Sequence, residues 1–149
     1  MILLAHMLLG AVVGYYAQNI FLAIILAILC HYFLDLFPHI EYSINHITSS
    51  NWKKSLPDFL KVFLDFTLGI LLIFLFSTGQ PMIYICAIIA IVPDGLTLIS
   101  YVSKNTWLAK HDYLHGEIIH YLTKQKKFPL FWRIFTQVTS IVICLLLLN

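Results

Sequence analysis

The chain has 149 residues, of which 60% are hydrophobic and only 11% are charged. A soluble domain carries roughly 25% charged residues, so this composition excludes an ordinary water-soluble globular protein and indicates an integral membrane protein. The formal net charge of +2 is too small to suggest a nucleic-acid-binding protein, and no nucleic-acid partner is expected.

Long apolar runs separated by short polar stretches predict about five transmembrane helices. A helix crosses a bilayer with about 17–25 residues, and a strand cannot cross without closing a barrel. The first two runs are at the short end of that range, so they either span or form a re-entrant pair. We therefore expect a single all-α, polytopic transmembrane bundle over residues 1–149. Its spans are expected at about 2–17, 20–37, 58–76, 81–102 and 129–148.

The first run starts at Ile2 with no basic residues before it and no clear cleavage site, so we interpret it as a retained helix. His6, Gly10 and Gly14 recur at four-residue spacing along it. The GxxxG pattern is typical of a close-packing helix face. His6 should therefore point into the bundle.

The second run carries His31 and Asp35 near its end, and His39 follows directly after Pro38. His31 and Asp35 are four residues apart, so they share one helix face. In the third run, Asp65 lies about two helical turns from the start.

The fourth run is interrupted by Pro93, Asp94 and Gly95 about two turns before it ends. A proline frees a backbone carbonyl and a glycine allows close approach, which favours a site at this depth. Asp94 is thus a candidate ligand.

The polar stretch from Ser103 to Phe128 is predicted to contain an amphipathic helix at about 106–123, on the cytoplasmic side. His111 and His115 are four residues apart, a spacing that lets two imidazoles on one helix face bind one metal ion. His120 would lie on another face of a continuous helix, and Gly116 would break the helix and turn it back.

The basic residues predict the orientation of the chain. They lie in the two long polar stretches or just inside the helices that leave them, and the short connections 18–19 and 77–80 carry none. The positive-inside rule places the N-terminus in the cytoplasm and the C-terminus outside. The residues concerned are Lys53, Lys54, Lys61, Lys104, Lys110, Lys124, Lys126, Lys127 and Arg133. They either reflect this rule alone or also hold anionic lipid.

Ionisable groups from four predicted helices reach one layer of the membrane. An aspartate at a helix centre costs about 2.5–3.5 kcal/mol, so such groups indicate function. The candidate metal ligands are His6, His31, Asp35, His39, Asp94, His111 and His115. This donor set suits a divalent transition metal, zinc first and manganese or iron as alternatives. Asp65 or Glu117 would act as general base. The structural alternative is interfacial histidines, with the aspartates in buried hydrogen bonds or paired with Lys53 or Lys61.

The segment from His31 to His39, the Pro93-Asp94 pair and the later HxxxH element resemble those of small bacterial membrane proteins known as membrane-bound metal-dependent hydrolases. That group is similar to zinc-dependent phospholipase C. The resemblance implies a zinc-dependent phosphoester hydrolase of the inner membrane. Here Gly95-Leu96 follows Asp94 where that family has a second acid, and His111 to His115 stands in place of its late HRxxTHS element.

The expected function is a membrane-embedded, metal-dependent hydrolase of a phosphoester, in particular of a membrane lipid, at the cytoplasmic face. Its expected partners are membrane lipid and a divalent metal ion. A metal-ion or proton transporter is the alternative, although the outer halves of the helices are almost purely apolar. A non-catalytic membrane scaffold is a third interpretation.

Overall fold

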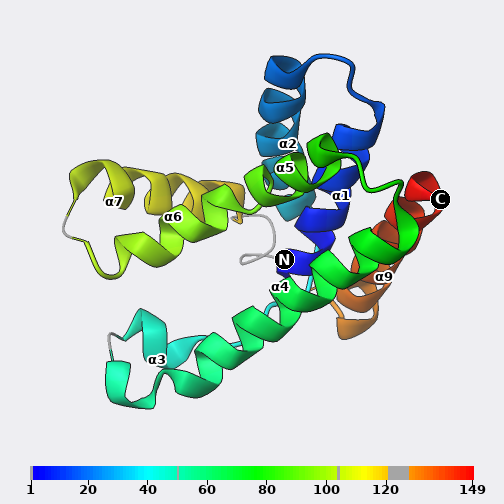
Figure 1. Ribbon diagram of the computed structural model, residues 1–149. Coiled ribbons are helices and arrows are strands. Elements are labelled where there is room, and N and C mark those ends of the chain that lie inside the picture. The colour runs from blue at the N-terminus through cyan, green and yellow to red at the C-terminus, as the bar shows by residue number, and fades with distance from the viewer. Residues whose placement is uncertain (1, 50, 104, 121–127) are drawn as a thin grey trace.

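The computed structural model describes residues 2–149 except Ser50, Lys104 and residues 121–127. Every regular element in the described residues is a helix, as the sequence predicted (Figure 1). In chain order the elements are α1 (Leu3–Tyr16), α2 (Ile20–Asp35), α3 (Asn45–Thr48), a 3-10 turn (Trp52–Lys54), α4 (Leu56–Phe76), α5 (Pro81–Ile89), α6 (Val92–Ser100), α7 (Thr106–Tyr113), a π-helix (Leu114–Ile119) and α9 (Leu130–Leu148).

Three helices among the described residues are long and apolar enough to cross a membrane. They are α4, the nearly continuous pair α5 and α6, and α9. The apolar helices α1 and α2 have 14 and 16 residues. At 1.5 Å per residue they extend over about 21 and 24 Å, against a hydrocarbon core about 30 Å thick. The structure thus supports membrane association through three candidate spans, and five crossings are not established.

The short helix α1 occupies the centre of the bundle, where it contacts α2, α4, α5 and α9 (Figure 1). Most of its residues are buried, and Met7, Leu8 and Ala11 are fully enclosed. A helix that is hydrophobic all round is expected to be buried in this way. Because α1 is covered by protein rather than lipid, its length does not have to match the bilayer.

Small residues allow α1 to approach its neighbours closely. A Cβ atom at Gly10 would lie 2.5 Å from the carbonyl oxygen of Cys86, and one at Gly14 would lie 2.5 Å from that of Met82. Both carbonyls belong to the α5 backbone, which cannot move aside as a side chain can. The close-packing face predicted from the GxxxG spacing is therefore confirmed.

The fourth apolar run is interrupted, as the sequence indicated, and the break falls at Ala90 and Ile91. Pro93 lies in the first turn of α6, where its missing N–H has no intrahelical partner to lose. Asp94 lies in the same first turn. The break lets α6 leave the line of α5 and pack beside α7 (Figure 1).

The loop after α2 is held in place by the start of α9. Arg133 Nε donates a hydrogen bond to the carbonyl oxygen of His39 at 2.7 Å, and the backbone N–H of Ile40 donates to Gln137 Oε1 at 3.0 Å. These bonds position His39 beside the end of α2.

The far end of the same loop is held by α4. Asp58 Oδ2 accepts a hydrogen bond from the backbone N–H of His46 at 2.9 Å, and Asp58 Oδ1 accepts one from Lys61 Nζ at 3.2 Å. The structural alternative that paired Lys61 with Asp65 or Asp94 is not what these contacts show. Lys61 instead stabilises the loop.

Candidate metal centre

The carboxylate of Asp35, at the end of α2, is completely buried among four imidazoles. Its Oδ2 atom lies 3.1 Å from His31 Nε2, 3.0 Å from His115 Nε2 and 3.4 Å from His120 Nε2. Its Oδ1 atom lies 3.2 Å from His6 Nε2. Residues from α1, α2 and the π-helix segment thus converge on one anion, and the predicted pairing of Asp35 with Lys53 is not needed to explain its burial.

Four side chains form the first candidate ligand group: His31, Asp35, Asp94 and His115. One ligand atom from each lies within 4.8 Å of the others. The two Nε2 atoms are 3.1 Å apart, and Asp94 Oδ1 lies 3.8 Å from that of His31 and 3.7 Å from that of His115. Ligands bound tetrahedrally at about 2.1 Å lie about 3.4 Å from one another. These separations therefore fit one tetrahedral ion.

Buried imidazole nitrogens in this region lack well-aligned hydrogen-bond partners. Within the described part of the chain this holds for His31 Nδ1 and for His6 Nδ1, whereas His6 Nε2 faces Asp35. A buried polar atom left unpaired costs about 1–3 kcal/mol, and an ion is one of the recognised explanations for such an atom. The nitrogens and carboxylate oxygens that converge here are the donor atoms a divalent transition metal prefers.

A second candidate ligand group consists of Asp35, His39 and His120, again with one atom of each within 4.8 Å of the others. Glu41 adjoins it, with Oε1 lying 2.8 Å from His39 Nε2 and 3.2 Å from His120 Nδ1. Asp35 belongs to both groups. The site can therefore hold one ion, or two ions that share this carboxylate.

The π-helix brings His115 and His120 to the same side of their segment. The backbone N–H of His120 donates to the carbonyl oxygen of His115, five residues earlier, at 3.3 Å. This i to i+5 pattern defines a π-turn, and such turns are frequent at functional sites. The prediction that His120 lies on another face, with Gly116 breaking the helix, was wrong. Gly116 lies inside the π-helix, and the wider turn brings both histidines to Asp35.

Neighbouring hydroxyl groups orient two of the histidines. Thr97 Oγ1, one turn after Asp94 in α6, lies 3.0 Å from His115 Nδ1. A hydrogen bond to the second ring nitrogen is how proteins commonly hold a ligating histidine in place. His111 Nε2 lies instead 3.1 Å from the hydroxyl of Tyr32. The structure therefore places His111 beside the site but in neither ligand group.

Other predicted site residues lie outside the two ligand groups. His6 contacts Asp35 but belongs to neither group. Asp65 Oδ2 accepts a hydrogen bond at 2.6 Å from the backbone N–H of Leu3, at the start of α1, where the helix dipole favours an anion. Glu117 is exposed on the π-helix. The role of Asp65 or Glu117 as a general base stays a prediction.

The charges around the second group attract cations. Hydrogen bonds from His120 and then from His39 hold the pKa of Glu41 below its usual range. Burial lowers the pKa of His120, but its hydrogen bonds to Asp35 and Glu41 outweigh burial and raise that pKa to about 9. Burial and the nearby His115 lower the pKa of His111. Two carboxylates thus dominate the field at this corner of the site.

A polar pocket of about 270 Å³ opens onto both ligand groups. Its polar lining residues include Glu41, Asp94, Thr97, Asp112, His115 and His120. Asp94 is the most accessible member of the first group, with 22% of its side chain exposed. A small polar molecule in the pocket would reach the ligand atoms through Asp94.

Sequence reasoning did not assign His120 or Glu41 to the site. The five-residue separation of His115 and His120 suits a π-turn but not an α-helix, and this spacing was the available signal. No comparable pattern pointed to Glu41, which lies in a loop. Comparisons of the chain with protein-family models, curated proteins and solved structures found no match.

Proposed function

We propose that this chain is a membrane-embedded, metal-dependent hydrolase that acts on a phosphoester at the cytoplasmic face. The observation that carries the proposal is the buried Asp35 carboxylate, shared by two ligand groups beside a polar pocket. The resemblance to membrane-bound metal-dependent hydrolases is part of the same proposal.

The accessibility of Asp94 supports a catalytic rather than a purely structural centre. Structural zinc sites are closed on all sides, whereas catalytic sites keep a position for water or substrate. Asp94 and His115 line the polar pocket, while His31 and Asp35 are buried and are not among its lining residues. A bound divalent ion, zinc first and manganese or iron as alternatives, would supply Lewis-acid activation of the phosphoryl group and of water.

Side chains of the pocket would accept and donate the protons that hydrolysis transfers. A water oxygen forms the new bond to phosphorus, the ester P–O bond breaks, and the departing alkoxide gains a proton. A carboxylate within reach of the water must take up its proton. Glu41 and Asp112 line the pocket, whereas Asp65 and Glu117 are not among its lining residues. The pocket therefore favours Asp112 over Asp65 and Glu117. The hydrogen bonds that hold the pKa of Glu41 low make Glu41 a weak base.

The proposed location is the bacterial inner membrane, with the N-terminus in the cytoplasm and the C-terminus outside. The described basic residues are Lys53, Lys54, Lys61, Lys110 and Arg133. Lys104, Lys124, Lys126 and Lys127 lie outside the described residues. The positive-inside rule would put this set in the cytoplasm if α1 and α2 complete five crossings.

Packing between α2 and α5 favours an enzyme over a transporter. Ala23, Ala27, Cys86 and Ala90 form a buried apolar cluster that extends from the candidate site along these two helices. An ion crossing the membrane needs polar partners along its path, because polar groups are costly in hydrocarbon. This cluster contains no charged side chain that could bind an ion. We therefore propose that the candidate site opens to one side of the membrane only.

The test is hydrolysis by the purified, zinc-loaded protein in detergent micelles, measured with a phosphomonoester and a phosphodiester. We expect turnover that stops on chelation and that Asp94→Ala abolishes. His46→Ala is the matched control, because His46 contacts Asp58 and lies outside both ligand groups. Equal rates in wild type and Asp94→Ala would refute the proposal. Zinc accumulation in sealed vesicles without hydrolysis would favour the transporter.

A further inference from the structure

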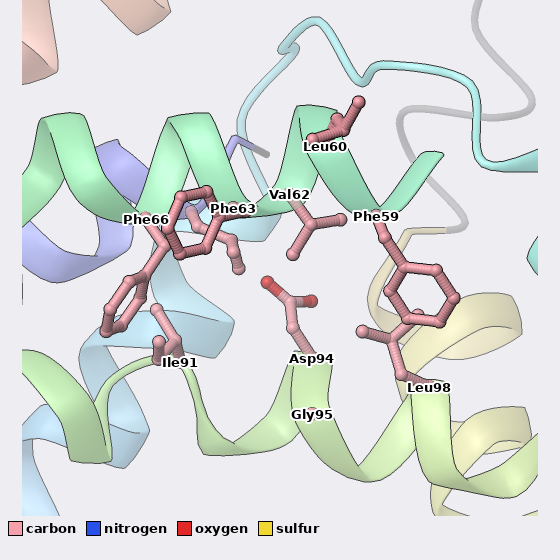
Figure 2. A pocket seen from close by; sticks show the side chains of 10 residues that line it. Phe59, Leu60, Val62, Phe63, Phe66, Ile91, Asp94, Gly95 and Leu98 are labelled. Atoms are coloured by element: carbon pink, nitrogen blue, oxygen red, sulfur yellow. The ribbon is translucent and has the colours of Figure 1, made fainter. Parts of the chain in front are cut away.

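An apolar groove adjoins the polar pocket. The groove measures about 550 Å³ and lies between α4 and α6 (Figure 2). Its lining residues are Leu3, Phe59, Leu60, Val62, Phe63, Phe66, Ile91, Asp94, Gly95 and Leu98. Four of these, Leu3, Val62, Asp94 and Leu98, also line the polar pocket. The two cavities therefore meet at the candidate ligand Asp94.

Asp94 is the one ionisable side chain among the residues that line the groove. Figure 2 shows its carboxylate directed toward α4, below the apolar side chain of Val62. An ionised aspartate at the edge of an apolar surface costs free energy unless a cation or hydrogen-bond donors compensate its charge. The groove thus combines an apolar wall with a charged end that belongs to the candidate metal centre.

The groove lies on the surface of two candidate membrane spans. Its walls belong to α4 and to the pair α5 and α6, two of the candidate membrane spans. Phe63 is 63% exposed and Phe59 is 49% exposed, although both line the groove. Exposed apolar side chains of a membrane span contact the hydrocarbon chains of lipids. The concave shape of the groove and its charged end distinguish it from the rest of the span surface.

We infer that the groove binds the hydrocarbon tail of a membrane lipid whose phosphate end lies in the polar pocket. This inference rests on the proposed function and names its substrate class. The groove volume falls within the range of about 300–1,000 Å³ that is usual for small-molecule sites. The lipid enters sideways from the bilayer, between α4 and α6, and its phosphate reaches Asp94 without leaving the membrane surface.

The test is photo-crosslinking in phosphatidylcholine vesicles that contain the full, zinc-loaded chain. The probe is a long-chain alkyl phosphonate, whose P–C bond is not hydrolysed, with a diazirine near the end of its tail. We expect mass spectrometry to map the crosslinks to the groove walls, at residues 59–66 and 91–98, and excess unlabelled alkyl phosphonate to remove them. Uniform labelling of exposed positions such as Leu71, Phe74 and Leu75 would overturn the inference, because it reports only bulk lipid contact.

A matched pair of variants sharpens the test. Leu98→Trp places a large ring in the groove and should abolish the specific crosslinks. Ile99→Trp alters the neighbouring residue, which is exposed and does not line the groove, and should leave them intact. Zinc content checks that both variants fold. The map of the wild-type protein decides the outcome even if Leu98→Trp fails to fold.

The result is separable from the proposed hydrolysis. Groove labelling without any hydrolysis would leave the lipid site standing and remove the proposed enzyme. Hydrolysis of soluble phosphoesters together with uniform labelling would support the proposed hydrolase and refute the inference that its substrate is a lipid.

Discussion

Asp35 is the residue on which the candidate centre depends. It contributes to both ligand groups and contacts the nitrogen atoms of His6, His31, His115 and His120. The histidines come from three separate elements, so their spacing in the sequence does not bring them together. Their common partner is the Asp35 carboxylate. A buried carboxylate needs such partners, because an unpaired charge in this environment is very costly.

We predict that Asp35→Asn lowers zinc affinity by more than about 100-fold, since loss of a ligand should exceed the 10–100-fold cost of losing an outer-shell partner. The amide keeps the size of the side chain and removes its charge. Competition with a chelator of known affinity measures the change. Glu117→Gln is the control, because Glu117 is exposed and lies outside both groups. Equal affinities in Asp35→Asn and wild type would rule out Asp35 as a ligand.

Much of the ligand set could be predicted at the scale of single residues. Depth in the membrane and four-residue spacing pointed to His31, Asp35, Asp94 and His115, which the structure joins in one group. The same reasoning included His111, which contacts Tyr32 instead. Which histidine meets the carboxylate depends on helix rotation and tertiary packing, and a spacing rule contains neither.

At the scale of elements, the π-helix decides which side chains reach the site. Sequence periodicity assumes an α-helix, and under that assumption His120 points away from His115. The π-turn adds one residue to the turn and restores a common face. The positions of the helices could be predicted from apolar runs, but the five-residue spacing of His115 and His120 shows a π-turn only once both are known to contact Asp35.

Deleting one residue from the π-helix should convert it to an α-helix and rotate His120 away from Asp35. We predict that deletion of Ile118, which is exposed, removes zinc binding by the second ligand group. Ile118→Ala keeps the residue count and should bind zinc as the wild type does. Zinc stoichiometry of the two purified variants measures the effect. If the wild type binds two ions, unchanged stoichiometry after the deletion would show that the π-turn does not position His120; if it binds one ion, unchanged zinc affinity would show the same.

The contact between α1 and α5 provides a stability test at the same scale. Gly10→Ala should lower the thermal unfolding temperature in detergent, because the added Cβ would lie 2.5 Å from a backbone oxygen of α5. Overpacking of this kind costs about 1–3 kcal/mol. The control is Gly95→Ala, where an added Cβ meets nothing within 4 Å and the residue lies in helix α6. An equal or higher unfolding temperature for Gly10→Ala would contradict the close packing of α1.

At the scale of the whole molecule, the sequence prediction and the structure differ most at the short helices α1 and α2. Composition and apolar runs could establish an all-helical membrane protein, but run length alone counted five spans. The structure shows that α1 is enclosed by four other helices. An enclosed helix can be apolar without facing lipid, so hydropathy cannot distinguish it from a span.

Cysteine labelling addresses the five proposed crossings. We predict that Gln18→Cys, in the connection between α1 and α2, reacts with an impermeant maleimide only from outside the cell. The background replaces Cys30, Cys86 and Cys144, which are free cysteines. Lys53→Cys, in the polar stretch before α4, is the control and should react only after the membrane is permeabilised. Labelling of Gln18→Cys only after permeabilisation would identify α1 and α2 as a re-entrant pair.

The metal content of the purified protein tests the central claim most directly. Elemental analysis by mass spectrometry should find a transition metal, zinc first, bound to the wild-type chain and to the control His46→Ala. The same measurement should find the metal lost from His31→Ala and from Asp94→Ala, which each remove a member of the first ligand group. A wild-type protein that carries no transition metal, and binds neither zinc nor manganese when they are added, would contradict the account.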